Sequence, residues 1–396
     1  MKFIDLGLDP RILEGIDAMG YENATPVQQQ VMVPILEGKD IIAAAQTGTG
    51  KTAAFLLPLL HRLLTSPHHA GDINAMIIVP TRELAIQIAE SIEGLSYFTD
   101  VSSIAVYGGG DGNSFVTEKK ALTSGVDIVV CTPGRMIAHL NMGYVKLKGL
   151  KYCVLDEADR MLDMGFSDDL SKIFTFLPAV RQNLLFSATM PAKMRVLAKK
   201  LLNNPIEINI AISKPPEQIV QKAFILYEAQ KVPIIIDMLS SKKFSKVIVF
   251  CSKKLNVKQL TVKLKSAKLA VAEIHSDLDQ KSREQYLQDF RNQKINILVA
   301  TDVLSRGIDI DDIDLVINYD VPNDGEDYIH RIGRTARAAT SGTAFTLVSE
   351  NEQGKCAIIE QLLGEPIFKG TVPAEFGPTP AYNPKAVVKK GFNRRR

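Results

Sequence analysis

The stretch Ile41-Ile42-Ala43-Ala44-Ala45-Gln46-Thr47-Gly48-Thr49-Gly50-Lys51-Thr52 is an apolar run that ends in a turn rich in glycine and threonine. The helix-like segment 53–57 follows it. Glycines allow successive backbone N–H groups to face one anion, and the start of a helix adds partial positive charge. We therefore predict a phosphate-binding loop, with Lys51 on the β- and γ-phosphates of a nucleotide and the Thr52 hydroxyl on Mg²⁺. The alternative is a turn that opens an ordinary helix.

One position departs from the strict phosphate-loop pattern. The pattern G-x-x-x-x-G-K-[ST] has glycine where this chain has Ala45. The form Ala-x-Thr-Gly-x-Gly-Lys-Thr is the variant seen in helicase-type nucleotide sites. Ala45 therefore favours this type of site among the phosphate-binding loops.

Length and composition indicate two domains. The chain has 396 residues, of which 46% are hydrophobic, enough for two full cores. Apolar runs have strand length, so we expect no transmembrane helix, and the N-terminus lacks a signal-peptide pattern. Four scattered cysteines favour free thiols in a reducing cytosol over disulfides or zinc. We expect a cytoplasmic monomer. With a formal net charge of +3, a nucleic-acid surface would need local clusters of basic residues.

The first half alternates strand-like and helix-like segments, which predicts a parallel, doubly wound sheet. The expected strands are 41–45, 75–79, 103–106, 128–131, 152–155 and 183–186. Ligands bind such sheets at the carboxyl ends of the strands. Polar motifs follow five of these strands: 47–52, 80–85, 132–135, 156–159 and 187–189. They predict one composite site.

A second block of the same kind follows a proline-containing linker. Pro215 and Pro216 disfavour helix and central strand, so we place the boundaries at 1–209, 210–218 for the linker and 219–366. The expected strands are 219–227, 247–251, 270–274, 297–300, 315–319 and 343–347, with helices at 259–264 and 283–291. This block lacks a glycine phosphate loop. Residues 367–396 are rich in proline, end in a basic run and predict a flexible tail, either solubilising or an auxiliary RNA contact.

Three further stretches carry chemistry. Thr25 and Pro26 are typical of a helix start, and Gln28 places an amide just before the phosphate loop. Asp156 follows an apolar strand, where a carboxylate can hold Mg²⁺ through water. Glu157 beside it could activate a water molecule. The alternative is that this acidic turn only caps the start of a helix. The run 330–337 contains three arginines, of which Arg334 and Arg337 would share a helix face and act as arginine fingers; a solvated face is the alternative.

Taken together, these motifs resemble the DEAD-box ATP-dependent RNA helicases of superfamily 2 over about residues 3–350, most like the compact bacterial RhlE-type members. The matching motifs, in order, are Phe3 with 21–28, 45–52, 80–85, Gly108-Gly109, 132–135, 156–159, 187–189, 249–251, Gln280 with Arg283, 301–302, 305–309 and 330–337. The resemblance implies two tandem RecA-like domains, each a mostly parallel doubly wound sheet flanked by helices. Tyr21 replaces the more usual Phe, Ser305 a common Ala and Ala336 a usual Gly.

The resemblance also implies roles for single residues. ATP and Mg²⁺ would be held by Phe3, Tyr21, Gln28, Ala45, Gln46, Thr47, Gly48, Thr49, Gly50, Lys51, Thr52, Asp156, Gly307 and Asp309, with Gln28 reading adenine and Asp309 the ribose. Arg334 and Arg337 would meet the γ-phosphate, His330 would bridge to the acidic motif, and Ser187 and Thr189 would couple hydrolysis to closure. RNA would lie on Pro80, Thr81, Arg82, Gly108, Gly109, Thr132, Pro133, Gly134, Arg135, Gln280, Arg283, Thr301 and Asp302.

Contacts of this kind fall mostly on phosphates and sugars, so recognition should be largely independent of base sequence and should favour RNA. Three functions stay open at this point: an RNA-stimulated ATPase that unwinds short duplexes, an ATP-gated RNA clamp or assembly factor with little unwinding, and a DNA helicase of the same superfamily. Gln28, the Ser-Ala-Thr motif 187–189 and Asp159 speak against the DNA helicase. Ribonucleoprotein assemblies are possible partners.

Overall fold

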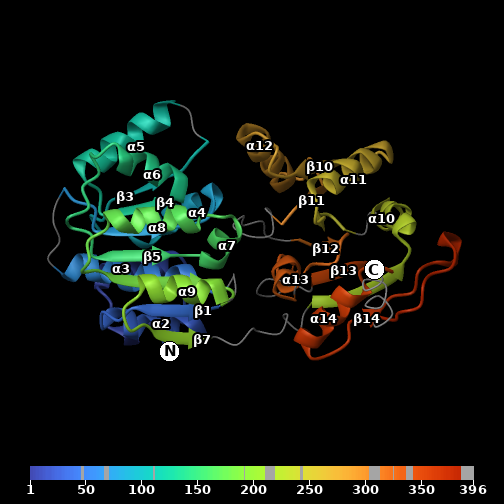
Figure 1. The fold of residues 1–396 in the computed structure, drawn as a ribbon, viewed down its shortest axis with the longest axis horizontal. Coiled ribbons are helices and arrows are strands. Elements are labelled where there is room, and N and C mark those ends of the chain that lie inside the picture. Colours follow the sequence, from blue (N-terminus) through green and yellow to red (C-terminus); the bar gives the residue numbers. More distant parts are fainter. Residues whose placement is uncertain are drawn as a thin grey trace, which may run out of the picture. The chain divides into compact units, whose positions relative to one another are not determined.

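The computed structural model of the chain describes residues 1–45, 49–66, 71–109, 112–190, 192–209, 219–240, 244–302, 313–323, 325–335 and 342–384. Its contacts divide the chain into two compact units, Met1–Ile212 and Ser213–Arg396 (Figure 1). The division falls within the segment 210–218 that the sequence indicates as a linker; those residues lie outside the described part.

Unit 1 is built on a seven-stranded sheet, in which every described pairing is parallel. The strand order is β3-β4-β2-β5-β6-β1-β7. Most of these strands are buried on both faces, as the near-continuous apolar runs of the sequence predict. The strands are β1 (Ile41–Ala44), β2 (Ala75–Ile78), β3 (Ser103–Val106), β4 (Ile128–Cys131), β5 (Tyr152–Leu155), β6 (Gln182–Ser187) and β7 (Ile206–Asn209).

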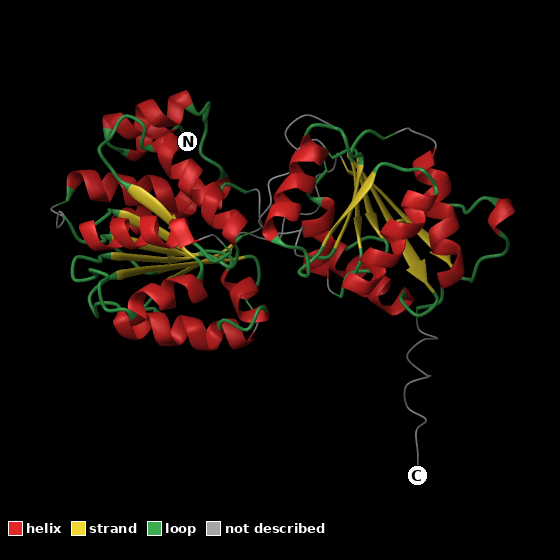
Figure 2. Cartoon of the chain, turned by 90° about the horizontal axis from the view of Figure 1, so that it is seen from above, coloured by secondary structure: helices red, strands yellow, loops and turns green. Residues whose placement is uncertain are grey.

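Helices cover both faces of this sheet (Figure 2). Side chains alternate along a strand, so Ile41 and Ala43 of β1 enter one core while Ile42 enters the other. The helical elements are η1 (Phe3–Leu6), α1 (Pro10–Ala18), α2 (Pro26–Leu36), α3 (Lys51–Thr65), α4 (Arg82–Leu95), α5 (Gly112–Ser124), α6 (Pro133–Asn141), α7 (Ala158–Asp163), α8 (Ser167–Phe176) and α9 (Ala192–Leu201).

Unit 2 repeats the plan with a second seven-stranded sheet, again parallel in every described pairing. The strand order is β10-β11-β9-β12-β13-β8-β14. Its strands are β8 (Ile219–Leu226), β9 (Val247–Phe250), β10 (Val271–Ile274), β11 (Ile297–Ala300), β12 (Leu315–Asn318), β13 (Gly342–Ser349) and β14 (Phe368–Lys369). Its helical elements are η2 (Glu228–Gln230), α10 (Lys231–Ser240), α11 (Lys254–Ser266), α12 (Gln280–Arg291), α13 (Gly325–Ile332), α14 (Gln353–Leu363) and η3 (Ala374–Phe376).

The predicted parallel, doubly wound architecture is confirmed in both units, and each predicted strand is present with its ends shifted by at most two residues. Thr25 and Pro26 start α2 as predicted, because Thr25 is its N-cap and Pro26 its first residue. The sequence did not predict two strands, β7 and β14, which are short and lie at the edges of their sheets. Within the described residues, no helix is both long and apolar enough to cross a bilayer.

The prediction of a flexible tail from residue 367 is wrong for residues 367–384, which pack on unit 2. Ile367 is buried, and β14 pairs with β8. Val372 and Phe376 pack against one core of the unit, while the Gln230 amide donates to the Phe376 carbonyl at 2.7 Å. The prolines that suggested disorder instead fix an extended path across helices and strands. Residues 385–396 lie outside the described part.

We predict that these contacts stabilise unit 2. A chain ending at residue 366 should lose at least about 3 kcal/mol of unfolding free energy in this unit, because several apolar side chains become solvent-exposed or are removed. Urea unfolding followed by hydrogen exchange, which resolves α14 and β8, measures the loss. A chain ending at Pro384 is the control and should match the full chain. Equal protection in the two truncated chains would contradict the prediction.

Candidate functional site

The strand order of unit 1 places the predicted site residues in two neighbouring groups at the carboxyl ends of the strands. The phosphate loop follows β1, Asp156 follows β5 and Ser187 ends β6, and these three strands are adjacent in the order β5-β6-β1. The carboxyl ends of parallel strands lie at one edge, with neighbours about 4.8 Å apart. The topology therefore brings the predicted nucleotide-binding motifs together.

The motifs predicted to bind RNA lie at the carboxyl ends of the neighbouring strands in the same sheet. Pro80 follows β2, Thr132 follows β4, and Gly108 follows β3, in the adjacent order β3-β4-β2. Strand β2 pairs directly with β5. The two groups are therefore neighbours within one sheet, with no strand between them.

Lys51 is the first residue of α3 and lies after Gly50, whose φ of +88° is a left-handed conformation that suits glycine. The lysine is only 6% exposed, and its Nζ has no hydrogen-bond partner among the described residues. A buried ammonium group without a partner is costly. The phosphate groups of a nucleotide would supply acceptors at this position.

The amide of Gln28 links the start of α2 to the end of the phosphate loop. Its Oε1 accepts from the Thr25 N–H at 2.8 Å, and its Nε2 donates to the Gly50 carbonyl at 3.1 Å. The Thr25 hydroxyl donates to the Thr49 carbonyl at 2.8 Å. The amide that is predicted to bind adenine therefore also contacts the phosphate loop, so a change in loop conformation would alter its hydrogen bonds.

The two aromatic residues predicted near adenine differ in exposure. Phe3 is 4% exposed and packs in the core with α1 and α2, whereas Tyr21 is 39% exposed. Tyr21 therefore has a ring surface available for stacking, and Phe3 supports the site from beneath. Ala45, which directly follows β1, donates its N–H to the Ser187 carbonyl at 2.9 Å.

Asp156 is a buried carboxyl group whose protonation is perturbed. Burial is the largest cause and raises its pKa to about 6, with the charges of Glu157 and Asp159 adding to the rise and Lys51 opposing it. A cation beside this group would favour the ionised form. Among the described residues, no cluster of three or more His, Cys, Asp or Glu side chains is arranged to hold a metal.

Glu157 has an unusual backbone, with φ 49° and ψ 48° at the N-cap of α7. Left-handed conformations of non-glycine residues are strained and occur often at functional sites. Its Oε2 accepts from Arg160 Nη1 at 3.1 Å, and its N–H donates to Asp156 Oδ1 at 2.9 Å. The carboxylate is therefore held in one orientation next to Asp156. Arg160 is a residue that the sequence did not single out.

A hydrogen-bond network joins the acidic motif to the end of β6. Asp159 Oδ2 accepts from the Thr189 N–H at 2.9 Å, and the Asp159 N–H donates to Ser187 Oγ at 3.3 Å. Ser187 Oγ in turn donates to the Thr189 carbonyl at 2.7 Å. The structure thus brings together the three residues whose link the sequence predicted.

Arg82 connects two of the motifs predicted to bind RNA. Its guanidinium lies 4.7 Å from the centre of the Tyr107 ring, and Nη1 is 3.4 Å from the Gly109 carbonyl. Thr81 caps α4 by accepting from the Leu84 N–H. Tyr107 is a second residue that the sequence did not reveal, although its position directly before Gly108 is a usable signal.

The motif 132–135 forms the start of α6. Thr132 is the N-cap, Pro133 occupies the first helical position, and Gly134 is exposed. Arg135, one residue further on, forms an ion pair with Glu118 of α5 at 2.7 Å. A helix start leaves backbone N–H groups without intrahelical partners, and this one directly follows β4, so it is suited to bind an anion at the end of that strand.

In unit 2, Arg283 and Thr301 lie on the segments that follow the neighbouring strands β10 and β11. Arg283 lies on α12, whose first residue is Gln280, and Thr301 directly follows β11. Asp302 forms an ion pair with Arg331 through two hydrogen bonds of 2.6 and 2.9 Å. Arg331 is 1% exposed and also donates to Asn318 Oδ1. The Asp302 carboxylate therefore anchors this buried arginine, and its contact with RNA stays a prediction.

The arginine run shows one error in the sequence interpretation. Helix α13 ends at Ile332, so Arg334 lies beyond the helix and the predicted helical conformation is wrong at this residue. The chain leaves the helix because Gly333 ends it and Thr335 pairs with Ile313 as an isolated bridge. His330 and Arg334 are both buried. Several predicted residues lie outside the described part: Gln46, Thr47, Gly48, Gly307, Asp309, Arg337 and the side chain of Gln280.

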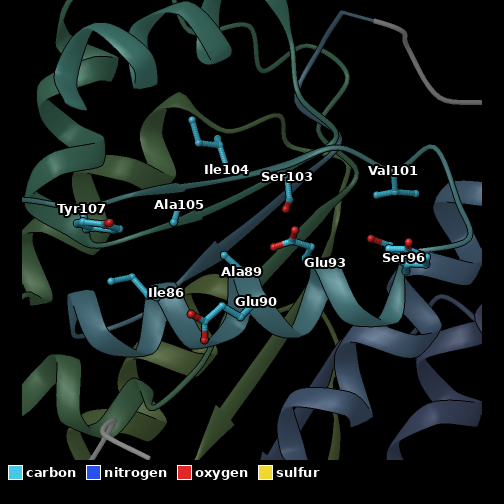
Figure 3. Close-up of a pocket in the computed structure, with 11 residues that line it drawn as sticks. Ile86, Ala89, Glu90, Glu93, Ser96, Val101, Ser103, Ile104, Ala105 and Tyr107 are labelled. Atoms are coloured by element: carbon cyan, nitrogen blue, oxygen red, sulfur yellow. The ribbon is translucent and has the colours of Figure 1, made fainter. Parts of the chain in front are cut away.

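A groove of about 590 Å³ lies away from these strand ends, between α4 and the edge strand β3 (Figure 3). Glu90, Glu93 and Ser103 are among its lining residues. Among its lining residues, none was predicted to bind nucleotide or RNA; Tyr107, on which Arg82 lies, forms one end of it. The chemistry therefore belongs to the strand ends rather than to this groove.

Comparison with known proteins gives a consistent result. Residues 25–197 match the family model "DEAD/DEAH box helicase", and residues 230–339 match "Helicase conserved C-terminal domain". The chain is 42% identical to the ATP-dependent RNA helicase CshA of Listeria monocytogenes over 91% of this chain and 68% of that protein. It is 38% identical to the ATP-dependent RNA helicase eIF4A of Scheffersomyces stipitis over 95% of this chain and 93% of that protein.

Solved structures agree with this assignment. S. cerevisiae Dbp5 bound to RNA and ADP BeF3 superposes with a TM-score of 0.83 at 32% identity, over 94% of this chain and 96% of that one. Mss116p bound to ssRNA and AMP-PNP gives a TM-score of 0.82 at 30% identity, over 94% of this chain and 80% of that one. The two sheets are thus tandem RecA-like domains, as expected. The RhlE-type likeness stays a prediction.

The raised pKa of Asp156 predicts a particular dependence of stability on pH. In the nucleotide-free protein its neutral form is favoured, so its contribution to stability is present at acid pH and is lost as pH rises through about 6. Asp156→Asn should therefore be more stable than the wild type at pH 7.5, on the order of 2 kcal/mol, with the difference shrinking toward pH 4.5. Urea unfolding across this range measures it.

Asp17→Asn on the exposed end of α1 removes the same charge and is the matched control, with a small difference at all pH values. An Asp156→Asn protein that is less stable than the wild type at pH 7.5 would contradict the assignment of a strained buried carboxylate.

Proposed function

Because the chain belongs to the DEAD-box family of ATP-dependent RNA helicases, we propose that it hydrolyses ATP in response to RNA and locally separates short RNA duplexes. The observation that carries the proposal is the single sheet edge of unit 1. There Lys51, Asp156 and Glu157 stand at the ends of β1 and β5, next to the β2 end that carries Arg82.

The nucleotide half fits ATP with Mg²⁺. Lys51 has a buried Nζ that lacks an acceptor among the described residues, and Asp156 has a pKa raised by burial; a phosphate and a divalent cation would stabilise both charged forms. Thr52 and Asp156 would hold Mg²⁺, the latter through water. When bound, Mg²⁺ neutralises charge on the β- and γ-phosphates. Gln28 and Tyr21 would recognise adenine, with the remaining loop residues on the phosphates.

Glu157 is the proposed base that orients the attacking water and accepts its proton. Its backbone conformation and its ion pair with Arg160 restrict the carboxylate to one position. Ser187 and Thr189 form hydrogen bonds with Asp159, which lies two residues after Glu157 in the chain. A change at the γ-phosphate can therefore be transmitted from the acidic motif to the end of β6 through three hydrogen bonds.

RNA is proposed to lie on the other half of the edge. Arg82, Thr132 and Arg135 would contact phosphates, with the N–H groups at the start of α6 adding to anion binding. In unit 2, Gln280, Arg283 and Thr301 would continue this path. Phosphate and 2′-OH contacts explain low sequence preference and a preference for RNA. Duplex separation then follows from bending one strand within the gripped segment.

Catalysis is proposed to need both units. His330, Arg334, Arg337, Gly307 and Asp309 would complete the ATP site when the units close on ATP and RNA. Arginine groups that reach the γ-phosphate stabilise transition-state charge. We further propose that the protein acts as a cytoplasmic monomer; the four buried free thiols support a reducing compartment.

The central test is steady-state ATP hydrolysis without nucleic acid, with single-stranded RNA and with DNA of matched sequence. RNA should stimulate turnover strongly and DNA should not. Glu157→Gln keeps the size of the side chain and removes the base, so it should lower the RNA-stimulated rate by about 10²–10⁴-fold.

Glu90→Gln, at an exposed position on α4, is the matched control and should hydrolyse ATP like the wild type. Equal stimulation by DNA would overturn the RNA assignment. Stable ATP-dependent RNA complexes without strand displacement would instead identify an RNA clamp.

A second test addresses adenine recognition. Gln28→Ala should raise the KM for ATP about tenfold and reduce the preference for ATP over GTP, because the amide contributes hydrogen bonds worth about 1–2 kcal/mol. Gln28→Glu retains the acceptor for the Thr25 N–H and so keeps the helix cap, but it loses the donor to Gly50. We expect Gln28→Glu to lose nucleotide affinity and to lower the melting temperature, because a buried carboxylate would then face the Gly50 carbonyl. An unchanged ATP/GTP preference in Gln28→Ala would refute the assignment to adenine.

A further inference from the structure

Arg135 of α6 belongs to a compact side-chain cluster that it forms with Glu118 of α5 in unit 1. We call it the Glu118 cluster; its members are Phe115, Glu118, Arg135, His139 and Tyr144. Only Arg135 belongs to a motif with a proposed role, and the other four residues were not singled out by the sequence.

Helix periodicity explains why these residues meet. On α5, Phe115 and Glu118 are three residues apart and so share the face that buries Leu122. On α6, Arg135 and His139 are four residues apart and share a face. Each helix therefore presents an aromatic ring and a charged or polar group to the other.

Glu118 is the centre of the cluster. Its Oε2 accepts from Arg135 Nε at 2.7 Å and from His139 Nε2 at 2.8 Å. Because His139 Nε2 faces a carboxylate, this nitrogen carries the hydrogen in the neutral ring, and Nδ1 accepts from the Tyr144 hydroxyl. The result is a chain of donors running from Tyr144 through His139 to Glu118.

The cluster is almost closed to solvent. Glu118 is 4% exposed and His139 is fully buried. Burial acts to raise the pKa of Glu118, but the hydrogen bonds from His139 and Arg135 outweigh it and hold the pKa below its usual value. The carboxylate is therefore ionised near neutral pH, and its two donors are charge-assisted.

These contacts restrict Arg135 to one orientation. Its Nε is bound by Glu118, and its guanidinium carbon lies 4.6 Å from the centre of the Phe115 ring. The His139 ring stacks on the same Phe115 at 4.4 Å with an angle of 13°. Nη2 of Arg135 is buried and has no hydrogen-bond partner among the described residues, so Glu118 does not occupy this nitrogen.

We propose that Glu118 is a positioning residue for RNA binding, which holds Arg135 ready for a phosphate of the RNA backbone while His139 and Tyr144 hold Glu118. The proposal rests on the proposed function, in which Arg135 contacts RNA. Without the carboxylate, the long arginine side chain must be ordered when RNA binds. That ordering should weaken RNA binding about three- to tenfold.

An opposing effect exists, because removal of Glu118 adds one positive charge near the RNA. A gain of one net charge strengthens backbone binding only modestly and is screened by salt. The two effects have opposite signs in RNA affinity, so the experiment separates positioning from simple neutralisation.

The test uses the full chain and measures the KM for single-stranded RNA and kcat in RNA-stimulated ATP hydrolysis, together with RNA affinity by fluorescence anisotropy in the presence of a non-hydrolysable ATP analogue. The variants are Glu118→Ala, Glu118→Gln, Arg135→Ala and the double variant Glu118→Ala/Arg135→Ala. Glu90→Ala makes the same charge change at an exposed site on α4 and is the matched control.

Glu118→Ala should raise the KM for RNA about three- to tenfold with little change in kcat, and Glu90→Ala should change neither. Glu118→Gln should recover most of the loss, because its carbonyl oxygen can accept from both donors. The double variant should be no weaker than Arg135→Ala, since Glu118 acts through that residue.

Three results would overturn the proposal: a Glu118→Ala protein that binds RNA as tightly as the wild type or more tightly, additive losses in the double variant, or no recovery by Glu118→Gln. If Glu118→Ala does not fold, Tyr144→Phe decides the matter, because it removes only the hydroxyl behind His139 and should give a smaller rise in the same KM; no rise would reject the positioning role. If Arg135→Ala itself leaves RNA binding unchanged, the proposed RNA role of Arg135 fails, which is a distinct outcome.

Discussion

The structure of unit 1 depends on burying charged groups at the carboxyl ends of its central strands. Lys51, Asp156, Glu157 and Asp159 are all less than a tenth exposed, at the ends of β1 and β5. Burial of charges without full compensation costs stability. The cost is tolerated because two apolar cores, one on each face of the sheet, hold these strands rigidly. A phosphate beside Lys51 and a cation beside Asp156 would each favour the charged form of a buried side chain.

The strand ends that are proposed to bind RNA have a different physical requirement. Its arginines carry long, flexible side chains, and a flexible group contributes little to binding until it has been ordered. Arg82 is held against the Tyr107 ring, and Arg135 against Phe115 and Glu118. In unit 2, Arg331 is held between Asp302 and Asn318. Aromatic faces and carboxylates therefore act as supports for cationic groups throughout the molecule.

Much of this could be predicted from the sequence, for identifiable reasons. Strands buried on both faces are continuous apolar runs, so the sequence predicts 128–131, 152–155 and 297–300 with their observed ends. β7 and β14 lacked this signal, because three of the four β7 residues and Phe368 of β14 are exposed. The arginine run was expected to be helical, but tertiary pairing of Thr335 with Ile313 ends the helix early.

The candidate site was predictable where residue type alone sets the chemistry, as for Lys51 or Glu157. It was not predictable where the partner of a motif residue lies outside the motifs. Arg160, Tyr107 and Glu118 lie outside the motifs or between their key residues, and their roles follow from contacts that only the folded chain reveals. Motif residues therefore identify the reaction, whereas their orientation depends on neighbours that the motif does not contain.

The order of the strands adds a constraint on how ATP and RNA can influence each other within unit 1. β5 carries the acidic motif and pairs with β2, which leads into Arg82, so the two ligands would meet at adjacent strands. On the other side, β5 pairs with β6, whose terminal Ser187 already bonds Asp159. The acidic motif thus lies between the RNA-facing strand and the strand that carries the Ser-Ala-Thr motif. A displacement of Asp159 would alter its hydrogen bonds to Ser187 and Thr189, because β6 is fixed in the sheet by its backbone hydrogen bonds. The sheet therefore limits movement to the side chains and loops beyond the strand ends, where both proposed ligands would bind.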